Sequence, residues 1–165
     1  MNKFVFLSLL VILLSGSMST SSYAKDKNIN IKEKNKLVVT EVLDGDTLKG
    51  VIGGEKYATI RLADIDCPEF SKKSNGKLSK QAKEWNMEQD EVVKLGKKSK
   101  EKLASLLKLY EENISFVETP EKVCKTGNGD RLVGILYAKD INVNEFMLKE
   151  AKCRPFSCND KEKGK

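Results

Sequence analysis

The sequence predicts an α+β protein in which five short strands form a small Greek-key β-barrel with two or three helices. Three observations lead to this prediction. Five segments have the alternating or valine-rich apolar pattern of short strands. A clear amphipathic helix lies between the third and the fourth segment, and another helix follows the fifth. This order of elements suits an OB-fold, the natural candidate among small Greek-key barrels.

The strands carry the most regular pattern in the chain, and we expect them at residues 37–43, 46–52, 56–62, 114–118 and 132–138. Gly53 and Gly54 separate the second strand from the third. Both glycines can adopt positive φ, so the pair predicts a tight hairpin. In the second strand Asp46 shares a face with Leu48. If this face looks inward, the Asp46 carboxylate needs a cation or hydrogen-bond donors.

The region between the third and fourth strands is less regular. Residues 72–83 are polar and are expected to form an exposed loop, and residues 78–95 are weakly helical. A solvated surface helix is the simpler interpretation of this segment, and an inserted basic segment is the alternative. Gly96 interrupts the pattern, and a cleaner helix is expected over residues 97–110. Its apolar stripe consists of Leu103, Leu106, Leu107 and Tyr110.

The last helix should begin at Asn142, a good N-cap residue, with Glu145 placed three residues later as in a capping box. Its buried side is expected to contain Val143, Phe146, Met147 and Ala151. Residues 153–165 form a polar tail that is expected to fray from Arg154 onward.

The N-terminal residues 1–24 have the features of a secretory signal peptide. Lys3 precedes an apolar run at residues 4–14, and a small-x-small cleavage site ends at Ala24. About 11 apolar residues are too few for a comfortable membrane anchor. We therefore expect an exported protein, periplasmic or secreted, without a membrane span after signal removal. A flexible lead-in at 25–36 would precede a single domain at 37–152.

The composition restricts the chemistry that the chain can perform. Its 165 residues contain no histidine, which excludes zinc fingers, histidine-dependent nucleases and serine or cysteine sites with a histidine base. A hydrolase of this composition would rely on carboxylates, a metal ion and arginines. The formal charge of +6 favours polyanionic partners such as DNA and RNA. We expect a monomer.

The chain has four cysteines, which in an exported protein can form disulfides. They are Cys67, Cys124, Cys153 and Cys158. The sequence alone does not select one of the three full pairings. A disulfide among the last three is expected, tying the tail to the loop near residue 124, with free thiols as the alternative. No two cysteines have Cys-x-x-Cys spacing, which disfavours a cysteine metal site.

Two acidic motifs stand on either side of the predicted hairpin. The first is Asp-Gly-Asp-Thr at residues 44–47, and the second is Arg-Leu-x-x-x-Asp-x-Pro-Glu at residues 61–69. Taken singly, the first motif is a turn signal and the second a group of surface charges. Their ordered combination, with the glycine hairpin between them, resembles the thermonuclease or staphylococcal-nuclease-like family. The resemblance covers residues 37–151 and implies the same OB-fold.

The resemblance also implies a metal site. Asp46 and Asp66 match the family's carboxylate ligands, and the backbone carbonyl of Cys67 matches its carbonyl ligand. Hard oxygen ligands of this kind suit Ca²⁺, with Mg²⁺ or Mn²⁺ as alternatives.

Three further residues match the family's catalytic groups. Glu69 matches the acid that accepts a proton from the attacking water or orients it, and Arg61 matches the first phosphate-binding arginine. Spacing from the fifth strand places the second such arginine at Arg131, although an exposed loop charge is the alternative. Two departures concern nucleotide seating: Gly129 stands where the family often has a tyrosine, and Phe156 is the only aromatic residue after position 146.

These matches predict an exported, divalent-metal-dependent endonuclease that cleaves DNA and RNA with little sequence preference and leaves the phosphate on the 3′ side. One alternative is a non-catalytic OB-fold module that only binds nucleic acid. Another is an exported interaction protein that uses the acids to hold structural calcium.

Overall fold

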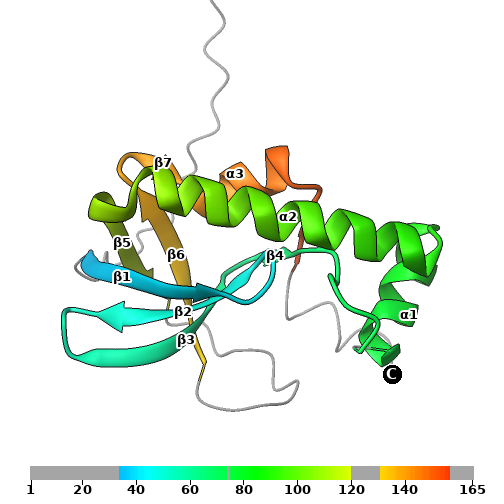
Figure 1. Ribbon diagram of the computed structural model, residues 1–165, viewed down its shortest axis with the longest axis horizontal. Coiled ribbons are helices and arrows are strands. Elements are labelled where there is room, and N and C mark those ends of the chain that lie inside the picture. Colours follow the sequence, from blue (N-terminus) through cyan, green and yellow to red (C-terminus); the bar gives the residue numbers. More distant parts are fainter. Residues whose placement is uncertain (1–33, 74, 120–130, 157–165) are drawn as a thin grey trace, which may run out of the picture. The chain divides into compact units, whose positions relative to one another are not determined.

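A five-stranded β-barrel lies at the centre of the fold (Figure 1). The computed structural model describes residues 34–73, 75–119 and 131–156, and all structural statements below concern these residues. The predicted signal peptide lies outside them.

The barrel consists of β1 (Asn35–Val42), β2 (Thr47–Ile52), β3 (Lys56–Leu62), β5 (Ile114–Glu118) and β6 (Leu132–Ala138). These strands pair in the order β3-β2-β1-β5-β6 with antiparallel neighbours. A parallel pairing of β3 with β6 closes the barrel. Gly53 and Gly54 form the β2–β3 turn with positive φ angles of 62° and 83°, as the sequence predicts. The expected α+β OB-type barrel is thus confirmed.

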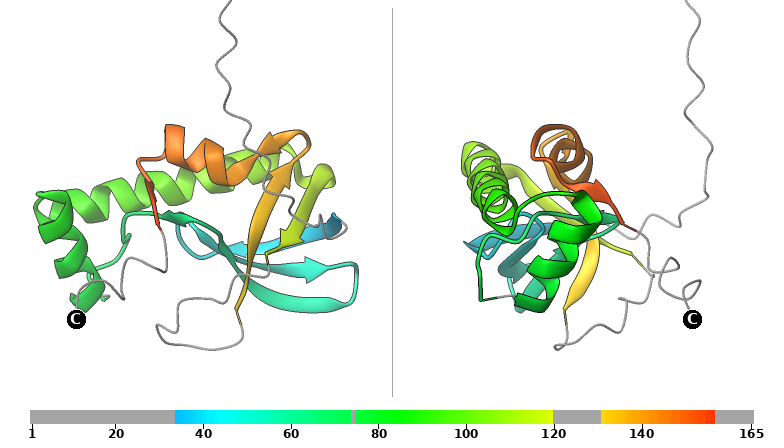
Figure 2. Two further views of the ribbon diagram at one scale, coloured as in Figure 1. Left: turned by 180° about the vertical axis from the view of Figure 1, so that it is seen from behind. Right: turned by 90° about the vertical axis from the view of Figure 1, so that its right-hand side faces the viewer.

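The helices are α1 (Asn75–Trp85), α2 (Gln89–Leu109), the short η1 (Glu111–Asn113) and α3 (Val143–Glu150). Helices α2 and α3 run next to each other along one side of the barrel, while α1 lies outside the barrel against α2 (Figures 1 and 2). The side chain of Asn142 accepts a hydrogen bond from the backbone N–H of Glu145, which confirms the predicted cap of α3. None of the helices in the described part of the chain has the length and apolar character of a membrane-spanning helix.

Three two-residue strands complete the described structure: β4 (Ile65–Asp66), β7 (Ile141–Asn142) and β8 (Arg154–Pro155). β7 extends the barrel sheet next to β6, and β4 pairs with β8 in a separate small sheet. The guanidinium of Arg154 also lies over the ring of Trp85, 4.3 Å from its centroid. The expectation that the tail frays from Arg154 onward is therefore wrong for this residue pair, because β8 is held by both contacts.

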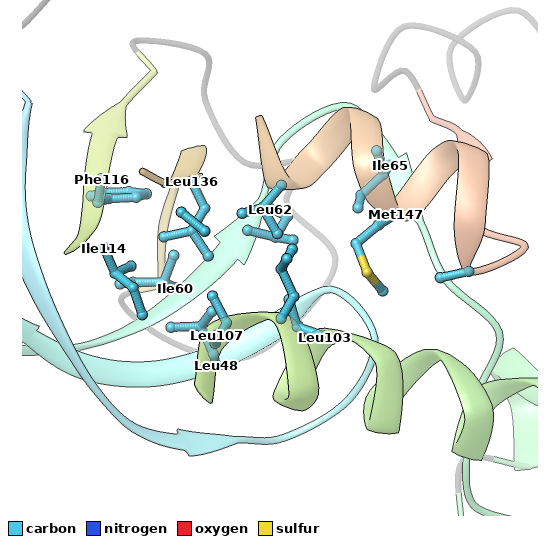
Figure 3. Close-up of a cluster of buried hydrophobic side chains, with 14 of the residues drawn as sticks. Leu48, Ile60, Leu62, Ile65, Leu103, Leu107, Ile114, Phe116, Leu136 and Met147 are labelled. Carbon is cyan, nitrogen blue, oxygen red and sulfur yellow. The ribbon is translucent and has the colours of Figure 1, made fainter. Parts of the chain in front are cut away.

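The hydrophobic core fills the barrel and the space between its strands and the helices α2 and α3 (Figure 3). Its largest fully buried side chains come from every main element and include Leu48, Ile60, Leu62, Leu103, Phe116, Leu136 and Met147. Each contributes about 1.5–3 kcal/mol through burial alone. The predicted stripe of α2 faces this core, with three buried leucines and the half-buried Tyr110.

The region before β5 differs from the sequence prediction. Residues 72–83 are not an exposed loop, because α1 begins at Asn75. This helix is also not simply solvated: Leu78 and Ala82 pack against Val92 of α2 in a second small apolar cluster.

Gly96 does not interrupt a helix either, because α2 continues through it without a break. A Cβ atom at this position would lie 2.5 Å from the carbonyl carbon of Glu69 and 2.6 Å from the backbone nitrogen of Phe70. The glycine is therefore required by the close approach of the loop that follows β4. Its role is tertiary, which a local sequence pattern does not reveal.

Candidate active site

Asp46 sits at the end of a tight turn that leads into β2. The carboxylate of Asp44 accepts a hydrogen bond from the backbone N–H of Asp46 at 3.0 Å, and the N–H of Asp44 donates to the carbonyl of Thr47 at 3.2 Å. A Cβ atom on Gly45 would lie 2.8 Å from the Cβ of Cys67. The turn therefore needs glycine to approach residues 66–69, which are called the acidic loop below. This geometry directs the Asp46 side chain inward, so the condition set by the sequence pattern is met and the carboxylate needs partners.

The Asp46 carboxylate is only 2% exposed and has partners on both oxygens. Oδ1 forms an ion pair with Nη1 of Arg61 and accepts a hydrogen bond from the Thr47 hydroxyl at 3.1 Å. Oδ2 accepts a hydrogen bond from the backbone N–H of Cys67 at 2.7 Å. The predicted need for a cation and donors is therefore met by the protein itself.

Arg61 joins the two acidic motifs. While its Nη1 pairs with Asp46, its Nη2 lies 3.2 Å from Oδ1 of Asp66 and donates to the carbonyl of Ile65 at 2.9 Å. One guanidinium thus holds both carboxylates that the sequence assigns to a metal. Since a guanidinium stays charged at physiological pH, this pairing persists over the working range of the protein.

Glu69 lies near Asp66 and is 8% exposed. Its Oε1 atom is 2.5 Å from Nζ of Lys77, and the same ammonium lies 3.4 Å from Oδ1 of Asp66. The structure therefore brings four of the predicted site residues together through two shared cations.

Arg131 lies directly before β6, where the sequence places it. Its Nε atom is buried and has no hydrogen-bond partner among the described residues. Arg131 directly precedes Leu132, which pairs with Ile60 beside Arg61 where β3 and β6 run parallel. Burial is the main cause that lowers the pKa of Arg61, and the positive charge of Arg131 acts in the same direction. Arg131 thus carries a buried Nε–H donor that has no acceptor among the described residues.

A disulfide joins Cys67 of the acidic loop to Cys153. It joins the loop to the segment after α3, and the two Cα atoms are 4.1 Å apart. Of the disulfides expected among Cys124, Cys153 and Cys158, the two that involve Cys153 are therefore excluded, whereas a Cys124–Cys158 pair is not tested. Those two cysteines lie outside the described residues. The disulfide is formed by the side chain of Cys67 and does not involve its backbone carbonyl.

Two residues of α1 that were not predicted from the sequence, Lys77 and Gln81, also contact the site. The amide of Gln81 is 2% exposed and forms hydrogen bonds with the loop that carries Asp66 and Glu69. One sequence signal could have found it. Gln81 occupies a position on the apolar stripe of α1 that also contains Leu78, Ala82 and Trp85, and a polar residue on such a stripe is buried with a partner.

The acidic cluster contains more carboxylates than positively charged side chains. The carboxylates are Asp44, Asp46, Asp66 and Glu69, and the cations near them are Arg61, Lys77 and Arg131. Burial raises the pKa of Asp44 above its ordinary value, although the charges of Arg61 and Lys77 act against this shift. Acids outnumber cations here, and their ligand atoms are hard oxygens. The donor set therefore fits a divalent cation, although the described residues contain no group of three or more acidic, cysteine or histidine side chains arranged around a metal.

Comparison with known proteins identifies the family. The family model of staphylococcal nuclease homologues matches residues 59–163. The chain belongs to this family. The match contains Arg61, Asp66, Glu69 and Arg131, whereas Asp46 lies before it. Staphylococcal nuclease homologues are generally metal-dependent.

A protein of Haemophilus influenzae named "Uncharacterized endonuclease" is similar to the chain, with 28% identity over 121 residues. The aligned part covers 72% of this chain and 51% of the relative, so the chain spans about half the length of that protein. Family membership and this similarity together support a nuclease function.

Proposed function

We propose that the chain is an exported, divalent-metal-dependent endonuclease that hydrolyses phosphodiester bonds in DNA and RNA with little sequence preference. One observation carries the proposal. Asp46 and Asp66 come from separate segments, converge on the guanidinium of Arg61, and lie beside Glu69. In a staphylococcal nuclease homologue, this arrangement supports phosphodiester hydrolysis more strongly than a structural role for the acids.

Asp46, Asp66 and the backbone carbonyl of Cys67 would hold the cation. We propose Ca²⁺, with Mg²⁺ or Mn²⁺ as alternatives, because all three donors are hard oxygens. When bound, such an ion makes water more acidic and neutralises charge on the phosphate.

The remaining residues would act on water and on the phosphate. Glu69 is placed to accept a proton from the attacking water or to orient it. Arg61 and Arg131 would bind the phosphate oxygens and stabilise the negative charge that develops in the transition state. Arg131 is well suited to this role because its buried Nε–H has no acceptor within the described residues. A phosphate oxygen would supply one.

Two properties support export and a polyanionic substrate. The Cys67–Cys153 disulfide is typical of proteins in oxidising compartments, which agrees with a signal peptide at residues 1–24. The formal charge of +6 would attract nucleic acid, so binding by the monomeric protein should weaken as salt rises. Affinity for DNA that stays constant between low and moderate salt would contradict this part of the proposal.

Cleavage of plasmid DNA and of RNA by residues 25–165, with Ca²⁺ and with EDTA, tests the function. Glu69→Gln and Arg131→Ala should each abolish most of the Ca²⁺-dependent cleavage. Glu55→Gln and Lys56→Ala are matched controls, since both side chains are exposed at the β2–β3 hairpin. They should cleave at the wild-type rate.

Each of the other outcomes is informative. Cleavage that survives Arg131→Ala would move the second phosphate-binding cation elsewhere. A salt-sensitive shift of DNA on a gel without cleavage under any divalent metal would replace the nuclease by a binding module. Stabilisation by Ca²⁺ without nucleic-acid binding would favour structural calcium. Fractionation of cells that express the chain with and without residues 1–24 tests export.

A further inference from the structure

Gln81 of α1 forms hydrogen bonds with three residues of the acidic loop at once. The helix itself lies outside the barrel (Figure 1). Gln81 projects from its buried face, whereas Lys77, one helical turn earlier, is exposed. The two residues approach the loop side by side.

Both the nitrogen and the oxygen of the Gln81 amide form hydrogen bonds. Its Nε2 donates to Oδ2 of Asp66 at 2.8 Å and to the backbone carbonyl of Cys67 at 2.9 Å. Its Oε1 accepts from the backbone N–H of Glu69 at 2.8 Å. Only this orientation of the amide satisfies all three groups, because a backbone N–H donates and a carbonyl accepts.

These bonds decide where two oxygens point. The other partners of the Asp66 carboxylate both contact Oδ1: the guanidinium of Arg61 and the half-exposed ammonium of Lys77. Gln81 is 2% exposed and sits on a helix packed against α2, so its amide is a fixed donor. It directs the Asp66 carboxylate and the Cys67 carbonyl by one rigid group, and it sets the backbone position of Glu69.

An apolar residue of similar size could fill the same space. It would leave the Glu69 N–H, the Cys67 carbonyl and one Asp66 oxygen without their donor or acceptor, which is costly in a buried position. The location of these three partners is therefore informative. They are the residues to which the proposed function assigns two metal-binding oxygens and the water-handling acid.

We propose that Gln81 is a positioning residue of this active site: its amide orients the Asp66 carboxylate and the Cys67 carbonyl for the divalent cation, and it places Glu69 relative to both. This inference rests on the proposed function for its catalytic consequence. Partners that hydrogen-bond to metal ligands orient those ligands, and their loss weakens metal binding or activity about 10- to 100-fold.

The test compares Gln81→Met with Gln89→Met in the full mature chain. Gln89 is exposed, and its amide donates to the hydroxyl of Ser79 on α1 at 3.2 Å, so the control removes a contact of the same helix that does not reach the loop. Four quantities are measured: Ca²⁺ affinity by calorimetry, kcat and KM for DNA cleavage, and DNA affinity in EDTA. Gln81→Met should weaken Ca²⁺ binding and lower kcat about 10- to 100-fold, with KM and metal-free DNA affinity unchanged.

A second measurement needs no variant. In the wild-type protein, the side-chain NH₂ resonances of Gln81 should shift on titration with Ca²⁺, whereas those of Gln89 should not. The inference is overturned if these resonances do not respond. It is equally overturned if Gln81→Met unfolds more easily but binds Ca²⁺ and cleaves DNA like Gln89→Met. Failure of the proposed function would look different, because the wild-type protein itself would then neither bind Ca²⁺ nor cleave.

Discussion

Arg61 and Asp46 form an ion pair at the end of the β2–β3 hairpin, where the aspartate is 2% exposed. Removing two charges from water is costly, and the pair offsets this cost only while both partners remain. The arrangement therefore links the stability of the barrel to the charge of the site.

Arg61→Met should destabilise the metal-free protein. The substitution leaves Asp46 buried without its cation, so the free energy of unfolding should fall by about 3 kcal/mol. Saturating Ca²⁺ should restore part of the loss, because a bound cation compensates the same carboxylate. Urea unfolding in EDTA and in CaCl₂ measures both effects.

Lys49→Met is the matched control for this experiment, since Lys49 pairs with Glu41 on the exposed surface of neighbouring strands. Exposed pairs contribute little, so its unfolding curve should stay close to that of the wild type. Equal effects of the two substitutions would contradict a special role for the buried pair.

Removal of the Cys67–Cys153 disulfide should lower both stability and metal affinity. The link closes a separation of 86 residues, for which loss of the chain-entropy effect corresponds to about 4 kcal/mol. The backbone N–H of Cys67 donates to Asp46 and its carbonyl is a proposed metal ligand, so Cys153→Ser should weaken Ca²⁺ binding as well. Urea unfolding and calorimetry measure the two quantities.

The linkage itself can be checked by mass spectrometry. Proteolysis of the Cys124→Ser/Cys158→Ser double variant without reductant should yield one crosslinked peptide pair that contains Cys67 and Cys153. Recovery of both cysteines as free thiols would refute the linkage.

The barrel could be predicted from the sequence because its signals are local. Alternation along β2 and β3, the glycine pair between them and the Asn142 cap each depend on residues that are close in the chain. These features do not depend on how distant segments meet. The alternation placed Asp46 on the same face as Leu48, but whether this face points inward was settled only by the structure.

The surroundings of the acidic loop could not be predicted in the same way. The partner of Cys67 is 86 residues away, and four cysteines allow several pairings. Gly96 resembles a helix break because the backbone that it contacts belongs to another segment. Lys77 resembles an ordinary surface residue until α1 is placed against the loop. Each of these roles arises from tertiary contact. Only Gln81 could have been recognised from the sequence, because it is a polar residue on the apolar stripe of α1.

Gly96→Ala should destabilise the protein although alanine favours helices. Its Cβ would meet the backbone of Glu69 and Phe70 inside van der Waals distance, and neither backbone can yield without moving the loop. We expect a loss of about 2 kcal/mol or more in the free energy of unfolding. Cleavage should fall too, since Glu69 would be displaced.

Gly76→Ala provides the matched control, because a Cβ atom at this position in α1 meets nothing within 4 Å. Helix propensity alone then applies, and the variant should be more stable by up to about 1 kcal/mol. Thermal and urea unfolding of the two variants compare the signs. A stabilised Gly96→Ala variant would show that the helix and the loop can separate without cost.

Lys77→Met should tighten Ca²⁺ binding by about two- to fivefold, the range expected for a half-exposed charge. The ammonium of Lys77 lies 2.5 Å from Glu69 and 3.4 Å from Asp66, so it repels a second cation among these carboxylates. Lys80→Met is the control, since Lys80 pairs with Glu84 on the solvent side of α1. The difference between the variants should shrink at high salt. Weaker Ca²⁺ binding by Lys77→Met would mean that the ammonium helps to hold the loop.

Arg131→Ala should separate activity from stability. Arg131 makes no ion pair within the described residues, and its buried Nε–H has no acceptor there. Its loss should change the free energy of unfolding by less than about 0.5 kcal/mol. If it binds the phosphate in the transition state, cleavage should still fall about 100-fold or more.

The test compares the activity and the stability of Arg131→Ala with those of Arg61→Met. Cleavage and urea unfolding are measured on the same preparations. Both variants should lose activity, but only Arg61→Met should lose stability, because Arg61 pairs with Asp46 and Asp66 in the free protein whereas Arg131 forms no ion pair within the described residues. A stability loss of similar size in Arg131→Ala would show instead that Arg131 supports the fold through contacts beyond the described residues, and the second phosphate-binding cation would have to be sought elsewhere.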